Sequence, residues 1–447
     1  MASAAEQMAS NLSWSTFGKA KELQQRILFA LALLIVFRIG TYIPVPGIDA
    51  GALRSFFDTA NQGIGGMLNL FTGGAISRMA IFSLGIMPYI SASIIVQLMA
   101  AMVPALESLK KEGEQGRKRL NQYTRYGTVM LALFQSYGIA VGLESQEMAT
   151  DPGWFFRATC VISLVGGTMF LMWLGEQITA RGIGNGISLI VFVGIIAELP
   201  GALAQFFELG RTGQIGIPVI LGVAVMAVAV VAFVVFMERA LRKIIIQFPR
   251  RQVGLKVYDS SSSNLPVKVN PSGVIPAIFA SSLLLLPLTV TSFSGGDATG
   301  IMSYVSAYLG RGQPAYLGLY ATLIVFFTFF YTANVAFKTE DVAENLKKQG
   351  GFVPGLRPGA KTVEYFDYVV ARLLVVGSAY LTAVCLLPEI LISRVAVPFY
   401  FGGTSLLIVV SVTMDTINQI QSHMLAHQYE GLIERSRLRG KARGKRK

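Results

Sequence analysis

Few residues in the chain have the type and spacing that a catalytic or metal site requires. The only two histidines, His423 and His427, are four residues apart, which would place both on one face of a helix. Imidazoles at that spacing can ligate a metal, but no carboxylate or cysteine pattern accompanies them. Cys160 and Cys385 both lie in apolar runs and indicate neither a disulfide framework nor a metal site. We therefore expect no metal and no cofactor, and interpret the histidines as part of a solvated tail helix.

Motifs of enzymes are also missing. The chain has no Walker motif, no H-E-x-x-H and no plausible set of nucleophile and base, so no catalytic residue is expected. The long apolar segments contain almost no ionisable side chain, and those noted lie at segment ends: Glu176, Asp367, Arg372 and Asp415. Because a charge at a helix centre costs roughly 2.5–3.5 kcal/mol on insertion scales, proton and ion pathways are marked by retained charges inside the membrane. Their near-absence argues against a proton-coupled pump and against an ion channel with a charged filter.

Branched aliphatic residues offer a different kind of function. Ile86, Ile90 and Ile94 are four residues apart and share one face of an expected helix over 79–99, in which Pro88 would lie near the middle. A ring of such side chains excludes ions by dewetting while offering no specific binding site. The alternative is an ordinary lipid-facing stripe.

The segment before this helix is uncharged and bracketed by glycines. Residues 63–74 contain an apolar piece far too short to span a bilayer, which indicates a re-entrant or internally packed element. Next to an aliphatic ring it could act as a removable plug. An ordinary loop outside the membrane is the alternative.

Composition places the chain among multi-pass membrane proteins. Of its 447 residues, 53% are hydrophobic and only 14% are charged. We predict an all-α fold with ten transmembrane helices, at 27–43, 79–99, 126–143, 158–175, 183–199, 216–237, 273–293, 315–335, 369–391 and 396–414. The polar residues 1–26 precede the first helix as an N-terminal tail, and no cleavage site follows it.

Charge predicts the orientation. With a cytoplasmic N-terminus, most of the 38 Lys and Arg residues fall in segments on the cytoplasmic side. This agrees with the positive-inside rule and places both termini in the cytoplasm. The net charge of +13 is then concentrated on one face.

Two cytoplasmic loops are unusually long. Residues 238–269 mix basic and alternating apolar residues, which is typical of a projecting β-hairpin. Residues 337–364 predict a short helix followed by a basic tip rich in Gly and Pro. Such loops could anchor the protein to anionic lipid or serve as docking sites for a large acidic or anionic partner.

Ten helices suggest a division into two halves of five, at 27–205 and 206–418, followed by a basic tail at 419–447. Because five is odd, the halves would be inverted relative to each other. A secondary transporter also uses inverted repeats and broken helices, although it would need a polar site in the membrane. A scaffold without a pore would leave the glycine-bracketed segment unexplained.

Seven strings in the chain resemble the SecY family, the channel subunits of the general protein-secretion translocase. They are FRIGTYIPVPGID, SLGIMPYISASIIVQL, KKEGEQGRKRLNQYTRYGT, MFLMWLGEQITARGIGNGIS, GVIPAIFASS, ENLKKQGGFVPGLRPG and PFYFGGTSLLIVV. The resemblance implies a clamshell of two inverted halves around a central pore, with a lateral gate towards lipid. It also implies a channel in the bacterial cytoplasmic membrane that translocates unfolded preproteins and releases transmembrane segments sideways.

The resemblance also implies roles for particular residues. The pore ring would be Ile86, Ile90, Ile187, Val191, Ile278 and Ile408. The plug would be residues 63–74, including Gly63, Met67, Leu68, Leu70, Phe71 and Gly74. The lateral gate, between the second and third helices and the seventh and eighth, would include Ser91, Gln135 and Asn270.

Partners follow from the same resemblance. The two long loops would receive the SecA motor or the ribosome through Arg250, Arg251, Lys256, Lys347, Lys348 and, above all, Arg357. SecE and SecG would be membrane subunits, and signal peptides and unfolded preproteins the cargo. The chain departs from the family pattern at Leu255-Lys256, where paired arginines are frequent, and at Phe337-Lys338, where an Asn-Pro pair is usual.

Overall fold

The structure is a computed structural model. It describes residues 21–49, 51–53, 69, 72–213, 216–248, 251–253, 256–258, 262–293, 313–395 and 403–444. Each of the ten expected spans corresponds to one helix: α3 (Lys21–Gly40), α6 (Met87–Met102), α8 (Glu114–Ser145), α9 (Trp154–Arg181), α10 (Gly186–Arg211), α11 (Ile217–Arg239), α12 (Ile275–Phe293), α14 (Pro314–Tyr331), α16 (Ala360–Val395) and α17 (Gly403–Gly444). Among the described residues, seven helices are long and apolar enough to cross a membrane, or eight with one bent pair.

Several helices are longer than expected. α8 begins twelve residues before the predicted start at 126, α16 begins nine before 369, and α17 continues to Gly444. A hydropathy window detects only the apolar part of a helix, which can lie in the hydrocarbon core of the membrane. The hydrogen-bonded helical backbone continues beyond it into polar sequence. α10 likewise continues to Arg211 through the proposed division at 205, so the chain passes to α11 at residues 212–216.

The second span differs from its prediction. The helix starts at Met87, so the expectation that Pro88 lies near its middle is wrong: Pro88 lies in the first turn, where its missing N–H costs no hydrogen bond. Residues 79–86 form turns instead, with positive φ angles of 41° at Met79 and 55° at Gly85. At its other end α6 meets α7 (Pro104–Lys111) at an angle of 103°.

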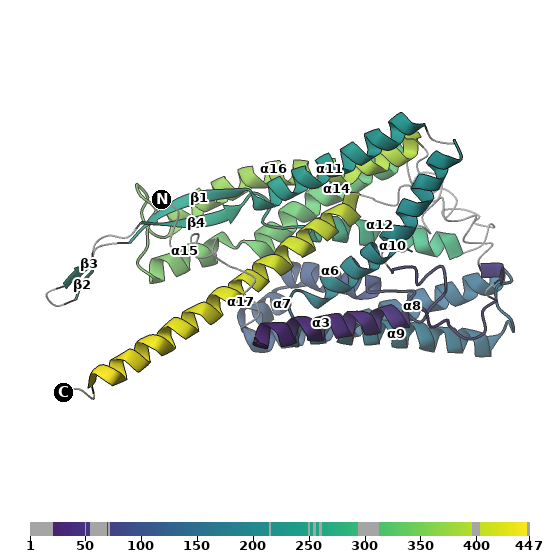
Figure 1. Ribbon diagram of the computed structural model, residues 1–447, viewed down its shortest axis with the longest axis horizontal. Coiled ribbons are helices and arrows are strands. Elements are labelled where there is room, and N and C mark those ends of the chain that lie inside the picture. Colours follow the sequence, from purple (N-terminus) through teal and green to yellow (C-terminus); the bar gives the residue numbers. More distant parts are fainter. Residues whose placement is uncertain are drawn as a thin grey trace.

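The helices form two groups that share one hydrophobic core. In the view of Figure 1, α3, α8 and α9 lie below α11, α14 and α16. Within the groups α6 packs on α8 and α8 on α9, while α12 packs on α14 and α14 on α16. α12 also contacts α6 and α8, and α10 contacts α17, so these pairs join the groups. The shared core contains side chains of both groups, such as Leu171 and Leu381, which are 0% exposed.

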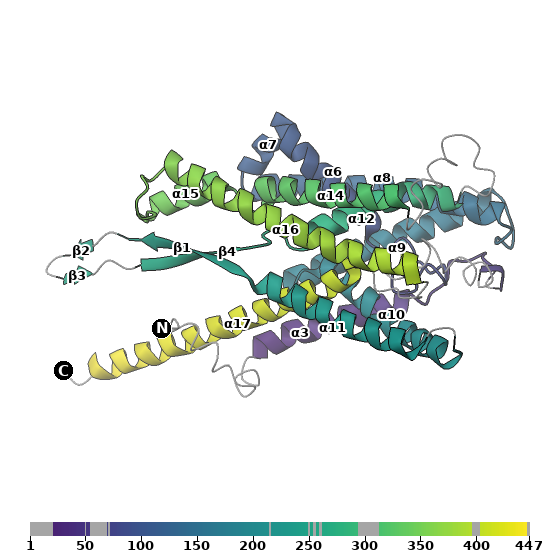
Figure 2. The same cartoon turned by 90° about the horizontal axis from the view of Figure 1, so that it is seen from above.

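The predicted β-hairpin is confirmed. β1 (Leu241–Gln247) pairs antiparallel with β4 (Ser262–Lys268), and β2 (Arg251–Val253) pairs with β3 (Lys256–Tyr258) nearer the tip. The hairpin projects from one end of the helical bundle, and the distal part of α17 extends in the same direction (Figures 1 and 2). The short helix predicted in the second loop is α15 (Thr339–Lys348).

The two long loops form a single unit, which the sequence did not indicate. Gln247 of β1 and Phe352 exchange two backbone hydrogen bonds of 2.9 Å. A separate hydrophobic cluster combines β1, β4, α15 and the first turns of α16: Ile244, Ile246, Val267, Ala343, Leu346, Val353 and Phe366. We call this unit the loop module.

Phe366 should determine whether the loop module stays assembled, because its side chain is 0% exposed at the centre of the cluster. We expect Phe366→Ala to cost about 3–5 kcal/mol within the module, as for other buried Phe truncations. Limited proteolysis in membranes should then cleave the hairpin faster. Tyr368→Ala, at a position 54% exposed on the same helix, is the control. Equal protection of both variants would contradict a jointly packed module.

Candidate functional site

Four of the six residues predicted for the pore ring line one small cavity inside the bundle. The cavity has a volume of about 10 Å³ and is lined by Thr72, Ile86, Met87, Ile90, Val191, Ile278 and Ser281. A cavity needs roughly 10–15 Å³ to hold one water molecule. The space is therefore at the lower limit for a single water, and most of its lining is aliphatic.

Three helices bring these side chains together from both groups. Ile86 is the residue before the first turn of α6, and Ile90 lies one turn along the same helix. Val191 comes from α10 and Ile278 from α12. The i, i+4 spacing of Ile86 and Ile90 is what directs both towards the cavity.

Ile187 and Ile408 are placed differently. Neither lines the cavity, but both belong to the same hydrophobic core, where Ile408 of α17 is 1% exposed. Ile187 packs beside α9, since a Cβ added at Gly175 would lie 3.1 Å from its Cγ1. Both residues thus belong to the core that contains the lining isoleucines, and neither lines the cavity itself.

Three lining residues escaped the sequence analysis. Met87 is three residues before Ile90, and Ser281 is three residues after Ile278, so helical spacing could have found both. Thr72 lies within the expected plug segment and is 3% exposed. Helical spacing could not predict that Thr72 lines the cavity, because the backbone at this residue is not helical.

Most of the predicted plug lies outside the described residues, including Gly63, Met67, Leu68, Leu70 and Phe71. Gly74 is described: it is buried and has a φ of 81°.

The three predicted gate residues lie on elements that meet. Ser91 is buried on α6, Gln135 is half-buried on α8, and Asn270 is buried just before α12, which packs on both helices. Ser282 of α12 also approaches Met87 of α6, with 3.7 Å between Oγ and Sδ. The residues predicted for the gate thus lie close to where the two groups touch.

The side chain of Asn270 does not bond to the other two gate residues. Its Nδ2 donates to Oε1 of Glu238 at 3.0 Å and to the carbonyl of Gly273 at 3.0 Å, while its Oδ1 accepts from Ser272 at 2.9 Å. Glu238, at the end of α11, is only 8% exposed. Asn270 therefore joins the end of α11 to the start of α12.

The predicted near-absence of ionisable groups in the spans needs correction. Glu389 lies within the ninth expected span and is 3% exposed, and Glu198 lies within the fifth, in α10. Windowed hydropathy conceals single carboxylates inside strongly apolar segments. In the part of the chain that the structure describes, no group of His, Cys, Asp and Glu could hold a metal ion, and His423 is exposed on α17.

The described docking candidates lie on the loop module. Lys347 and Lys348 are exposed in the last turn of α15. Arg357 is exposed between Gly355 and Gly359, whose φ angles are 82° and 112°, and its carbonyl accepts from Thr362 Oγ1 at 3.1 Å. Arg251 and Lys256 lie on β2 and β3 near the tip, and Arg250 is outside the described residues.

A family model described as SecY matches residues 80–417. Protein translocase subunit SecY of Escherichia coli (strain K12) is 53% identical over 434 residues, covering 96% of this chain and 98% of that protein. The SecY subunit of Pseudomonas aeruginosa is 52% identical over 434 residues, covering 97% and 98%. The chain belongs to the SecY family. It is therefore a multi-pass protein of the bacterial inner membrane and a protein-conducting channel, and it is not an enzyme.

Solved structures of SecY-like channels share the fold. One described as "The structure of a protein conducting channel" has a TM-score of 0.66 at 18% identity and covers 89% of this chain and 92% of its own. Sec61 in a canine ribosome–channel complex has a TM-score of 0.61 at 18% identity, with the same coverage. The ten-helix architecture expected for SecY is consistent with this likeness.

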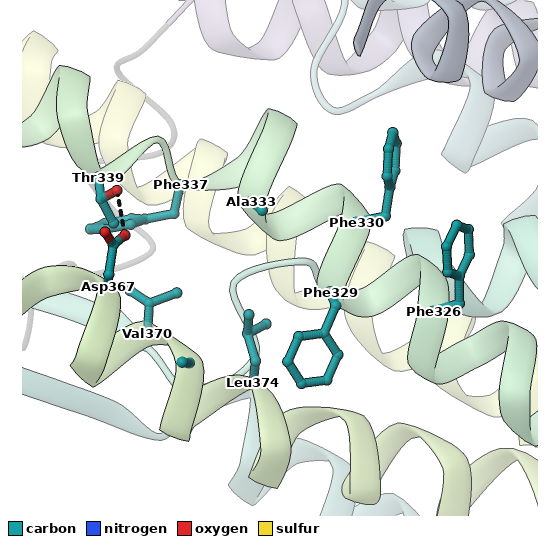
Figure 3. A pocket seen from close by; sticks show the side chains of 10 residues that line it. Phe326, Phe329, Phe330, Ala333, Phe337, Thr339, Asp367, Val370 and Leu374 are labelled. Atoms are coloured by element: carbon teal, nitrogen blue, oxygen red, sulfur yellow. Dashed lines mark hydrogen bonds between the residues drawn. The ribbon is translucent and has the colours of Figure 1, made fainter. Parts of the chain in front are cut away.

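A larger cavity, of about 680 Å³, lies where α14 and α16 meet (Figure 3). Its lining is apolar and aromatic, with Thr339 Oγ1 donating to Asp367 Oδ1 at 2.6 Å. Residues 332–336 at its edge form a π-helical turn, just before the Phe337-Lys338 pair that departs from the SecY pattern. None of the residues predicted for ring, plug, gate or docking lines this cavity.

The bond between Asn270 and Glu238 should be a measurable coupling in this SecY-family chain. Glu238→Ala and Asn270→Ala each remove one partner, so we expect their effects on the free energy of unfolding in detergent to be non-additive by roughly 0.5–3 kcal/mol. Glu238→Gln retains an acceptor and should be milder. Strict additivity of the two Ala variants would show that the bond contributes nothing.

Proposed function

We propose that Ile86, Ile90, Val191 and Ile278, supported by Ile187 and Ile408, form the ring that closes the pore. The observation that carries this proposal is the small cavity whose lining comes from α6, α10 and α12. A mainly aliphatic constriction with room for at most one water holds no continuous water column, so it would block ions by dewetting. It also carries no charge that would favour one cargo side chain over another.

The cargo is an unfolded polypeptide passing through this ring. Residues 63–74 would act as the plug and withdraw when the chain enters. Transmembrane segments would leave sideways between α6 and α8 on one side and α12 and α14 on the other, past Ser91, Gln135 and Asn270. The contacts of α12 with α6 and α8 support this route, because separating them would open the bundle towards lipid. The two groups would move as inverted halves, 27–205 and 206–418.

The loop module is the proposed docking site for the ribosome or the SecA motor. Sec61 and Ssh1, which have the same fold, are described in complexes with ribosomes. The exposed basic residues of the module suit acidic protein or ribosomal RNA, and its hairpin projects from the end of the bundle (Figure 2). SecE and SecG would be the membrane subunits, signal peptides would enter at the lateral gate, and anionic lipid would surround the cytoplasmic face. Both termini would lie in the cytoplasm.

Ile408→Asn tests the ring. The residue is 1% exposed in the hydrophobic core that also contains Ile86, Ile90 and Val191, so a polar group there should loosen ring packing and let water enter. We expect added ion conductance in planar-bilayer recordings of the purified channel. Ile417→Asn, at a position 44% exposed on the same helix, is the matched control. A channel with Ile408→Asn that remains as tight as the unmodified one would count against the seal.

Arg357 tests the docking site. Its neighbours Pro354, Gly355, Pro358 and Gly359 hold the backbone in a defined turn, so the guanidinium is presented outward. Arg offers a planar fork of donors to carboxylate, phosphate or carbonyl oxygens, and Lys does not. We expect Arg357→Glu to abolish SecA-driven import into inverted vesicles, and Arg357→Lys to reduce it clearly, with channel abundance unchanged. Near-normal import with Arg357→Lys would favour a merely electrostatic role for the loop.

A further inference from the structure

A cluster of charged and aromatic side chains surrounds the backbone at Gly73 and Gly74. Arg38 of α3 donates from Nη1 to the carbonyl of Gly73 at 2.6 Å, and from Nη2 to the hydroxyl of Tyr42 at 3.3 Å. The guanidinium of Arg78 lies over the ring of Tyr42 at 4.3 Å, and that of Arg38 at 5.3 Å. Arg78 Nη2 is 3.9 Å from Oε1 of Glu198 on α10. We call these four residues the arginine cluster.

The backbone that the cluster holds is tightly enclosed. Gly73 has a φ of 66°, and a Cβ added there would lie 3.0 Å from Arg38 Nη1 and 3.1 Å from the Cα of Gly194. A Cβ added at Gly74 would collide with the carboxylate of Glu198. Only glycine combines a left-handed backbone with such close approach. The position of this backbone is therefore set by α3 on one side and α10 on the other.

The residue next to Gly73 is one of those that line the cavity. Thr72 lines the cavity with the ring isoleucines, and its Cγ2 would lie 3.0 Å from a Cβ added at Gly85. A shift of the Gly73 carbonyl therefore moves Thr72 relative to the ring. Among the described side chains, Arg38 supplies the charged donor to that carbonyl.

We infer that Arg38 is a positioning residue for the pore seal: through its bond to the Gly73 carbonyl it keeps Thr72 packed against the isoleucine ring. This inference rests on the proposed seal and deepens it. Tyr42 and Arg78 assist Arg38 in this role. Both guanidinium groups lie over the ring of Tyr42, and this cation–π contact keeps the guanidinium of Arg38 aligned. Glu198 offsets part of their charge.

An ordinary surface ion pair would behave differently. The pair between Arg78 and Glu198 is long and partly exposed, and such pairs contribute little. The bond from Arg38 has a charged donor and a buried glycine carbonyl as acceptor, and it is short. Removing the charged donor of this bond should therefore shift the equilibrium between the closed and the open channel towards the open state by roughly tenfold or more.

Planar-bilayer recordings of the purified channel complex give the first test. We expect Arg38→Gln to raise the open probability of the resting channel roughly tenfold. Arg38→Lys, which keeps the charge but loses the fork of donors, should have an intermediate effect and serves if the Gln variant does not fold. Arg26→Gln, on the same helix, removes a side chain that bonds to Glu22 four residues away and should leave the channel closed.

Crosslinking gives a second readout that does not depend on the seal. In a channel with Cys160→Ala and Cys385→Ala, Thr72→Cys and Ser281→Cys line the same small cavity and should form a disulfide under mild oxidation, which needs no linker in so small a space. Arg38→Gln should lower the yield severalfold, and Arg26→Gln should not. Unchanged crosslinking in Arg38→Gln would overturn the inference. If Ile408→Asn fails to leak while Arg38→Gln still loses the crosslink, the proposed seal is wrong and the positioning role stands.

Discussion

The structure depends on one constraint: every backbone N–H and C=O inside a bilayer must find a partner within the protein. Helices meet it along most of the chain, but residues 72–86 are not helical. Their polar groups are satisfied by other means. The N–H of Val45 donates to Met79 and that of Ile81 to Ile43, both at 2.9 Å, Ser83 Oγ donates to the carbonyl of Ala75 at 2.9 Å, and Arg38 donates to Gly73. Irregular backbone can therefore reach the centre of the bundle, where it is enclosed by protein.

That enclosure explains why an apolar ring can form where it does. Because residues 72–86 enter the bundle without helical bulk, Thr72 and Ile86 can approach Val191 of α10 and Ile278 of α12. Each of these contacts is a dispersion contact, individually small. Separating them leaves no polar group without a partner, whereas parting a buried hydrogen-bonded pair would. Such contacts suit the pore constriction that we propose here, because it would have to open and close again.

How much of this could be predicted differs between fold and site. The ten helices follow from apolar windows, because burying backbone in lipid demands long uncharged segments. The ends of the helices cannot be predicted from apolar windows. α8 and α16 continue into polar sequence, and the start of α6 is fixed by the turns around Met79 and Gly85. Ile86 and Ile90 could be paired by spacing alone. The approach of Val191 and Ile278, like the joining of Gln247 to Phe352, is a long-range contact that leaves no local pattern.

The polar contacts are placed so that they complement the ring. Asn270 and Glu238 tie α11 to the start of α12, and Arg38 ties α3 to the backbone beside Thr72. Hydrogen bonds depend on direction, and they are expensive to leave unmade when buried. The bond between Asn270 and Glu238 therefore suits a position that stays fixed while the aliphatic contacts part, whereas the bond from Arg38 holds Thr72 in the closed channel and would break when residues 63–74 withdraw. Aliphatic side chains of similar volume repack at little cost, so an apolar ring alone specifies its own arrangement weakly. The directional bonds of Asn270 and Arg38 therefore restrict how the segments that carry these aliphatic side chains can pack.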